Sequence, residues 1–136
     1  MPRKGINADG ATAVGPYSHA VEHDGFVYLS GQTPMIPGTT GLVEGGIENQ
    51  TRQTFANLRA VLAAAGLTTA DVIKCNVFLT DMGNFAAMNA IYAEQFDAPY
   101  PARTTIGVAS LPIGAQIEIE MIATRPRQNP RDLSVG

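Results

Sequence analysis

The sequence predicts a single α+β domain in which two amphipathic helices cover one face of one mixed β-sheet. The chain has 136 residues, which is the usual size of one domain. Apolar residues make up 45% and charged residues 15%, too hydrophobic for a disordered chain and too interrupted for a membrane span. Alternating stretches and stretches with helical spacing follow the order strand, strand, helix, strand, helix, strand, strand.

The first two strands are expected within residues 17–31, as a hairpin. Residues 26–29, Phe-Val-Tyr-Leu, favour a strand, and His23-Asp24-Gly25 favours the turn before it. Residues 34–46 contain two prolines and four glycines, so they are expected to form a loop with several turns.

The first helix is expected to begin at Ile47 and end before Gly66. Gly66 suits the left-handed position that follows many helices, and Leu67 suits the hydrophobic contact that accompanies it. The residues with helical spacing are Ile47, Thr51, Phe55, Leu58, Leu62 and Ala65.

Residues 71–80 alternate as a strand with one apolar face. That face is expected to carry Ile73, Cys75, Val77 and Leu79, and the opposite face Lys74, Asn76 and Phe78. The second helix is expected to start with Asp81 or Asn84 as its N-cap and to run to about Phe96, because Pro99 and Pro101 prevent its continuation. Its apolar stripe is Phe85, Met88, Tyr92 and Phe96.

The last two strands are expected at residues 103–109 and 116–124, joined by the Pro- and Gly-containing segment 110–114 and paired antiparallel. Their apolar residues, Ile106, Val108, Ile117, Ile119 and Met121, are expected to face the helices. Alternation then places the intervening residues on the face that the helices leave bare, together with Lys74, Asn76 and Phe78. These residues are Arg103, Thr105, Gly107, Glu118 and Glu120.

Such a face is either solvated or packed against copies of the same chain. We favour a homo-oligomer with sites at its interfaces, because Phe78 is costly to expose and an arginine would lie among carboxylates.

Arg103 and the two glutamates are the first candidates for chemistry. A guanidinium matches a carboxylate with two parallel hydrogen bonds, although Arg103 could instead form a salt bridge with Glu118 or Glu120. Glu118 and Glu120 would lie about 7 Å apart on one strand face. One of them could orient or deprotonate a water molecule, and the alternative is two solvated carboxylates.

Two further polar residues stand at unusual places. Asn89 falls on the apolar stripe of the second helix, where a buried amide must be hydrogen-bonded; it either holds a backbone carbonyl or lines a pocket. Tyr17, at the start of a strand, could fill the core or close a cleft.

Several classes of function are disfavoured. Cys75 is the only cysteine, which excludes an intrachain disulfide and favours a core position. His19 and His23 would lie about 13 Å apart on a regular strand, so no metal site is expected. The net charge of −3 disfavours nucleic acid as a partner, and no membrane segment is expected. The N-terminus shows no secretory signal, so we expect a cytoplasmic protein.

Six motifs carry a resemblance to a known family and occur in the family's order. Over about residues 11–125 the chain resembles the RidA/YjgF family, which leaves 126–136 as a flexible tail of the single domain 1–136. The motifs are Gly15-Pro16-Tyr17-Ser18; Tyr28-Leu29-Ser30-Gly31-Gln32; Asn57-Leu58 with Ala64-Ala65-Gly66-Leu67; Val77-Phe78-Leu79-Thr80-Asp81; Pro101-Ala102-Arg103-Thr104-Thr105; and Leu111-Pro112 with Ile117-Glu118-Ile119-Glu120.

The resemblance implies a chorismate-mutase-like fold and a homotrimer with three clefts between subunits. It also implies hydrolysis of 2-iminobutanoate and 2-iminopropanoate to 2-oxo acids and ammonia, without a cofactor. Motif by motif, the catalytic residues would be Arg103, which binds the carboxylate, and Glu118, which aligns water. The substrate-binding residues would be Tyr17, Ser30, Gly31, Asn89 and Thr105, the last at a position where relatives often have Cys or Ser.

Three alternatives remain at this point. The chain could be a paralogue that deaminates another enamine, such as an aminoacrylate or aminomuconate, in a catabolic pathway. It could be a regulatory module that binds a small ligand without catalysis. It could have the RNA-cleaving or translation-inhibiting role attached to some relatives, which the acidic charge disfavours.

Overall fold

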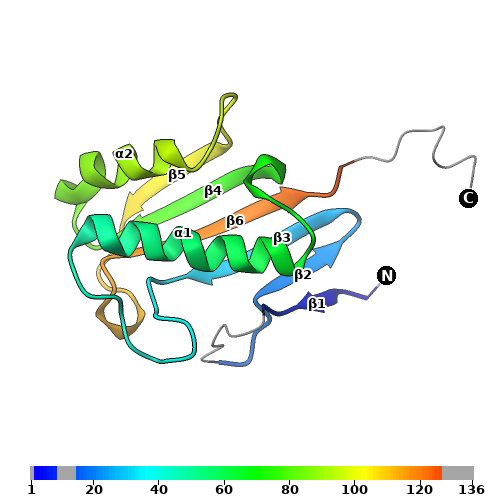
Figure 1. Ribbon diagram of the computed structural model, residues 1–136, viewed down its shortest axis with the longest axis horizontal. Coiled ribbons are helices and arrows are strands. Elements are labelled where there is room, and N and C mark those ends of the chain that lie inside the picture. Colours follow the sequence, from blue (N-terminus) through cyan, green and yellow to red (C-terminus); the bar gives the residue numbers. More distant parts are fainter. Residues whose placement is uncertain (1, 9–14, 127–136) are drawn as a thin grey trace, which may run out of the picture.

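The computed structural model describes residues 2–8 and 15–126, which form one six-stranded sheet with two helices across one face (Figure 1). The residues expected as a tail lie, apart from Pro126, outside the described part of the chain. The strands are β1 (Lys4–Ile6), β2 (Ala20–His23), β3 (Phe26–Gln32), β4 (Val72–Leu79), β5 (Ala102–Gly107) and β6 (Ile117–Thr124). The helices are α1 (Ile47–Ala64) and α2 (Phe85–Glu94), with short 3-10 turns η1 (Thr69–Asp71), η2 (Met82–Asn84) and η3 (Pro112–Gly114).

The strand order is β1-β2-β3-β6-β4-β5, with antiparallel neighbours except for the parallel pair β4 and β5. The single mixed sheet with both helices on one face is therefore confirmed. The hairpin β2–β3 is confirmed too, and its turn residues Asp24 and Gly25 both have positive φ. Residues 34–46 form a loop with one bridge between Met35 and Leu42, as expected.

The expected hairpin of the last two strands is wrong. β6 lies between β3 and β4, whereas β5 lies at the sheet edge beside β4. The reason is that β4, α2 and β5 form a crossover unit, and a strand that returns through a helix lies parallel to the one before it. Residues 108–116 then lead the chain from the edge back to the middle of the sheet.

This pairing reverses the face on which Arg103 was expected. Arg103 pairs with Cys75 and Thr105 with Val77, so both lie on the face that carries the helices. Ile106 pairs with Phe78 on the bare face and is 45% exposed. The bond from Lys74 Nζ to Thr104 Oγ1 (3.1 Å) confirms which residues of β5 lie on the bare face.

β4 departs from simple alternation at one residue. Val72 pairs with Ala123 and Lys74 with Ile122, so Ile73 is an extra residue in a β-bulge. Ile73 is 44% exposed and Val72 is buried in its place, which corrects the expected face of Ile73. Beyond the bulge, Cys75, Val77 and Leu79 are buried as expected.

Both helices begin and end close to the expected residues. At the end of α1, Gly66 has φ +74°, and Leu67 N–H donates to the Leu62 carbonyl (2.8 Å), which forms the expected left-handed cap. Asp81 accepts from Gly83 N–H (2.8 Å) and caps η2, after which α2 starts at Phe85.

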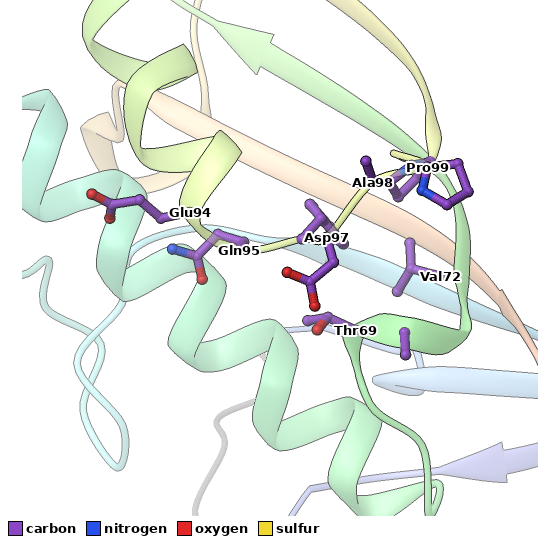
Figure 2. Close-up of a pocket in the computed structure, with 10 residues that line it drawn as sticks. Thr69, Val72, Glu94, Gln95, Asp97, Ala98 and Pro99 are labelled. Atoms are coloured by element: carbon purple, nitrogen blue, oxygen red, sulfur yellow. The ribbon is translucent and has the colours of Figure 1, made fainter.

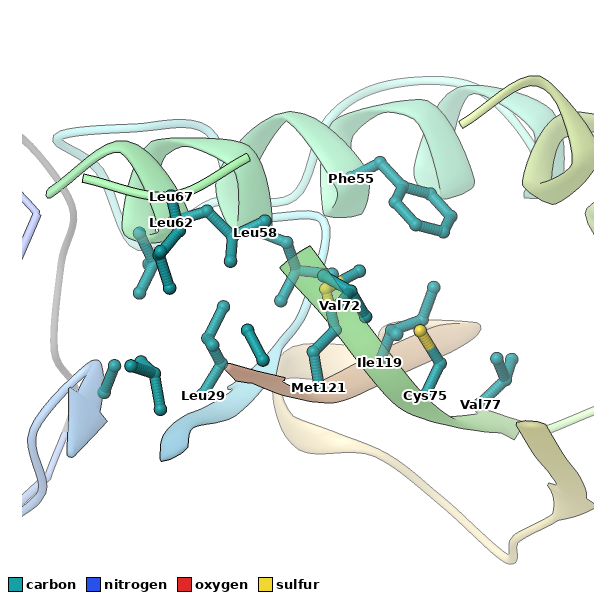
Figure 3. Packing of buried hydrophobic residues seen from close by; sticks show 14 of the residues in the cluster. Leu29, Phe55, Leu58, Leu62, Leu67, Val72, Cys75, Val77, Ile119 and Met121 are labelled. Carbon is teal, nitrogen blue, oxygen red and sulfur yellow. The ribbon is translucent and has the colours of Figure 1, made fainter. Parts of the chain in front are cut away.

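The core lies between α1 and the sheet (Figure 3). Phe55 of α1, Leu58 of α1 and Ile119 of β6 are completely buried there. Phe55 also meets Tyr92 and Phe96 in an aromatic cluster with ring centroids 5.1–5.9 Å apart. This cluster fixes which side of α2 is turned toward the sheet. Arg103 of β5 lies against that side of α2.

Candidate functional site

Arg103 is held by the side chains of α2. Its guanidinium carbon lies 4.6 Å from the ring centre of Tyr92 and 5.5 Å from that of Phe85. Its Nη1 donates to Asn89 Oδ1 at 2.6 Å. The three partners occupy positions i, i+4 and i+7 of one helix, which is the spacing of a single helix face. A cation over two aromatic rings, with an amide at one nitrogen, has a defined orientation.

Most of the hydrogen-bonding capacity of Arg103 is unused. A guanidinium has five N–H donors, and among the described residues only the one bond to Asn89 is made. Arg103 lines a cavity of about 370 Å³ together with Asn89, Tyr92, Ala93, Tyr100 and Pro101. An arginine with free donors at a cavity of this size is suited to bind a carboxylate with two parallel bonds.

Asn89 was expected to be buried, and this is wrong. It is exposed in the single chain, because the apolar face of α2 is formed by Met88, Ile91 and Tyr92. Of the two roles left open for its amide, the structure supports the second, since Asn89 lines the cavity and bonds to Arg103 rather than to a backbone carbonyl.

Three buried uncharged groups lie on the same side of the sheet as Arg103: the Tyr92 hydroxyl, the Cys75 thiol and the Thr105 hydroxyl. Burial raises the pKa of the Tyr92 hydroxyl, and the Cys75 thiol beside it adds to the shift. Burial likewise raises the pKa of Cys75, which is fully inaccessible and so occupies the core position expected for it. Thr105 Oγ1 is buried and has no hydrogen-bond partner among the described residues.

A second group of candidate residues lies where β3 meets β6. The Glu118 side chain packs directly on Gly31, so closely that a Cβ at position 31 would be 2.8 Å from Glu118 Oε2. Burial raises the pKa of Glu118, and the negative charge of Glu120 raises it further. Glu120 accepts from Asn76 Nδ2 (3.0 Å), whereas Glu118 makes no hydrogen bond within the described residues. The two glutamates therefore differ, and Glu118 is the one suited to act on a ligand.

Ser30 and Tyr17 belong to this second group. Ser30 Oγ donates to the Ser18 carbonyl (2.7 Å), and Ser30 N–H donates to the His19 carbonyl (2.9 Å). These bonds fasten the segment that carries Tyr17 to β3. The Tyr17 side chain is 44% exposed, so it does not fill the core.

One chain does not bring the two groups together. Glu118 pairs with Phe78, which pairs with Ile106, and Arg103 lies three residues before Ile106 on the opposite face. With strands about 4.8 Å apart and about 3.3 Å per residue, the Cα atoms of Glu118 and Arg103 are about 14 Å apart. Their side chains leave the sheet in opposite directions, so the salt bridge between them, weighed as an alternative role for Arg103, is absent from the described residues.

A second cavity of about 380 Å³ lies between η1 and the segment that follows α2 (Figure 2). Glu94 and Asp97 contribute carboxylates to its wall, and Glu94 also pairs with Arg52 (2.9 Å). Negative groups of this kind disfavour a carboxylate ligand there. No three His, Cys, Asp or Glu side chains in the described part of the chain are placed to hold a metal ion.

Some residues around Arg103, in contact with its guanidinium or lining its cavity, had been missed or assigned a different role. Phe85 and Tyr92 were expected only as core residues, and Ala93 and Tyr100 were not singled out. The available signal was the amide of Asn89 between two aromatic residues on one helix face. Nothing in the local sequence indicated Ala93 or Tyr100.

The fold and the Arg103 cavity define a small α+β protein with an arginine at the wall of a surface cavity. No helix in the described residues is long and apolar enough to cross a membrane. Residues 8–125 match the model of the endoribonuclease L-PSP family, so the chain belongs to this family, which includes the RidA/YjgF proteins. The resemblance is thereby confirmed.

Relatives within this family have different names. The chain is 45% identical over 109 residues to 2-iminobutanoate/2-iminopropanoate deaminase from Dermatophagoides farinae, covering 80% of this chain and 85% of the relative. It is also 45% identical over 126 residues to protein DfrA from Myxococcus xanthus, covering 90% and 96%. The crystal structure of TdcF from E. coli with bound serine is 39% identical and superposes with a TM-score of 0.85, covering 90% of this chain and 99% of that one.

Proposed function

We propose that the protein hydrolyses 2-imino acids, including 2-iminobutanoate and 2-iminopropanoate, to 2-oxo acids and ammonia. The observation that carries the proposal is Arg103, which is oriented by α2 and has unused donors at a cavity. Relatives named for this reaction support it, and the serine bound to TdcF shows that one relative holds a molecule with a carboxylate.

In the proposed mechanism, Arg103 binds the carboxylate and leaves the adjacent C=N carbon open to attack. Glu118 accepts a proton from water as the water oxygen bonds to that carbon. The raised pKa of Glu118 makes it a better proton acceptor than an ordinary surface carboxylate. The nitrogen of the tetrahedral intermediate takes up this proton from Glu118. The C–N bond then breaks as the hydroxyl oxygen forms the carbonyl, the hydroxyl proton passes to Glu118, and ammonia leaves. A protonated imine is already electrophilic, so the mechanism requires no cofactor.

The proposal places the substrate between subunits of a homotrimer. Arg103 and Glu118 of one chain lie on opposite faces, so Arg103 would act with the partner subunit's Glu118. The partner would also contribute the other members of the second group, Tyr17, Ser30 and Gly31. In the proposal, Thr105 Oγ1, which has no hydrogen-bond partner among the described residues, would orient the substrate beside Arg103.

The composition of the bare sheet face supports an assembly. Tyr28 is 47% exposed and Ile106 45%, and both lie on this face with half-buried Phe78. Large apolar groups gathered on one side of a sheet are typical of an interface.

A cytoplasmic location is also part of the proposal.

The test generates 2-iminopropanoate and 2-iminobutanoate with an amino-acid oxidase and follows their trapping as semicarbazones. The protein should lower the yield of semicarbazone, and Arg103→Ala should abolish this effect. Arg103→Lys is the matched control, since it keeps the charge but loses the planar fork; we expect at least a hundredfold loss. Unchanged trapping at high protein concentration would contradict the reaction, and full activity of Arg103→Ala would contradict the role of Arg103.

The oligomeric state is tested separately. Light scattering should give three times the mass of one chain. An active monomer would contradict a site between subunits, even if the reaction is correct. The alternative of a paralogue acting on another enamine predicts weak activity on both imines and strong activity on a larger unsaturated acid in the same assay.

A further inference from the structure

The Arg103 cavity is larger than recognition of a small imino acid requires, and we infer that it holds a bulky apolar side chain of the substrate. The inference rests on the proposed function and makes it more specific. It states that imines with a benzyl or isobutyl side chain are better substrates than those with a methyl side chain.

The size of the cavity is the first step. At about 370 Å³ it falls within the range of about 300–1,000 Å³ found for sites that enclose drug-sized ligands. The substrate carboxylate is taken by Arg103 at the wall. A methyl side chain would occupy little of the remaining space, whereas a benzyl group would occupy several times as much of it.

The chemistry of the walls is the second step. Only Arg103 and Asn89 present a charge or an amide, and the two are bonded to each other. The remaining walls are the methyl group of Ala93, the ring of Pro101 and the rings of Tyr92 and Tyr100. Tyr92 is itself buried, and the Arg103 guanidinium lies 4.6 Å from its ring centre, so the exposed apolar walls are those of Ala93, Tyr100 and Pro101. A site with two bonded polar groups for orientation and otherwise mainly apolar walls suits an apolar side chain.

Tyr100 supplies the third step. Its side chain is 54% exposed, the largest exposure among the large apolar side chains in the described residues. It stands between Pro99 and Pro101, which restrict the backbone. An exposed aromatic ring held on a stiff segment at a cavity is suited to stack on an aromatic substituent. The other cavity, which contains Glu94 and Asp97, offers no such combination with a cation.

The test compares imines derived from alanine, leucine and phenylalanine in the trapping assay, and the binding of the products pyruvate and phenylpyruvate by calorimetry. We expect kcat/KM for the phenylalanine-derived imine to be at least tenfold above that for the alanine-derived one. Phenylpyruvate should bind at least tenfold more tightly than pyruvate.

Ala93→Leu fills the cavity and should reduce both ratios to about one. Ala90→Leu is the matched control, because Ala90 is exposed on the same helix and does not line the cavity. Leu is almost as good a helix former as Ala, so neither change disturbs α2. Tyr100→Ala should also lower the ratios, and Tyr100→Phe should keep them.

The outcomes separate this inference from the proposed function. One outcome is that no imine is hydrolysed, but phenylpyruvate binds preferentially and Ala93→Leu abolishes the preference. This would contradict the proposed reaction and support the pocket for an apolar side chain. If the small imines are hydrolysed at least as well as the large ones, the reaction stands and the pocket is overturned. Equal binding of the two 2-oxo acids, or binding of neither, also overturns the pocket.

Discussion

Replacing Gly31 by alanine should slow the enzyme without unfolding it. The added Cβ would lie 2.8 Å from Glu118 Oε2, 2.9 Å from Cδ and 3.1 Å from Cγ, where about 3.4 Å is needed for ordinary contact. The carboxylate must therefore move by about 0.6 Å or more. Displacing a catalytic group by 1 Å can cost about a hundredfold in rate, so we expect kcat/KM to fall by about 10- to 100-fold.

The fold should tolerate this change. The atoms in the way belong to the end of a flexible side chain on the bare face, and alanine in a strand loses less conformational freedom on folding than glycine. The midpoint of thermal unfolding should therefore stay within a few degrees. Gly41→Ala is the control, since its Cβ would meet nothing closer than Thr39 Oγ1 at 3.8 Å.

A double-mutant cycle decides whether Gly31 acts through Glu118. In a Glu118→Ala background the clashing atoms are gone, so Gly31→Ala should have no further effect on the residual rate. If Gly31→Ala still lowers the rate tenfold in that background, Gly31 acts independently of Glu118, and the reasoning is refuted.

Three further predictions concern Tyr92, Glu118 and Gly66. Tyr92→Phe removes a buried hydroxyl that has no hydrogen-bond partner among the described residues other than the weak Cys75 thiol beside it, so the free energy of unfolding should stay unchanged or rise by up to about 1 kcal/mol. Urea unfolding measures this, and a clear loss of stability would reveal a strong bond to the hydroxyl. Tyr92→Leu removes the ring beneath the guanidinium and should weaken carboxylate binding in calorimetry. As the proposed base, Glu118 must be ionised to accept a proton. Its raised pKa should therefore place the acid limb of the pH–rate profile above the ordinary carboxyl pKa of 4.5. Glu120→Gln, which removes the neighbouring negative charge, should move that limb to lower pH, and a limb that does not move would exclude Glu118 as the titrating group. Gly66→Ala places a side chain at φ +74° and should cost about 1 kcal/mol, seen as a thermal midpoint lower by about 4 °C; Gly41→Ala again serves as the control.

The elements of the fold could be predicted because each has a local signal. The spacing of Phe55, Leu58 and Leu62 is that of a helix face, and Gly66 with Leu67 forms a known end signal. Alternation also assigned Cys75, Val77 and Leu79 to the buried face. These patterns depend on neighbours within a few residues, so no knowledge of the distant chain is required.

The partner of a strand has no comparable local signal. Residues 103–109 alternate in the same way whether they pair with β6 as a hairpin or with β4 through a crossover, yet the two pairings put Arg103 on opposite faces. The family motifs indicated Arg103 and Glu118 as candidate catalytic residues, but they did not indicate on which face of the sheet each side chain lies. Ile73 was misplaced for a related reason, because a bulge adds one residue without changing the composition of the strand.

Asn89 shows an intermediate case. Its unusual place on an apolar stripe correctly indicated a polar role, but exposure depends on what covers α2. In the single chain nothing in the described residues covers it, and its partner is Arg103 from a strand whose position was not known.

The opposite directions of Arg103 and Glu118 have a genetic consequence. A lesion at either residue damages a different half of the proposed site, so chains with Arg103→Ala and chains with Glu118→Gln are complementary. Under the proposed function, each chain alone would be inactive. In the proposed trimer, a ring that mixes the two chains would regain one native site, where the intact Arg103 of one chain faces the intact Glu118 of its neighbour. Two null alleles of this gene would then complement each other in the same cell, which a site contained within a single chain could not do.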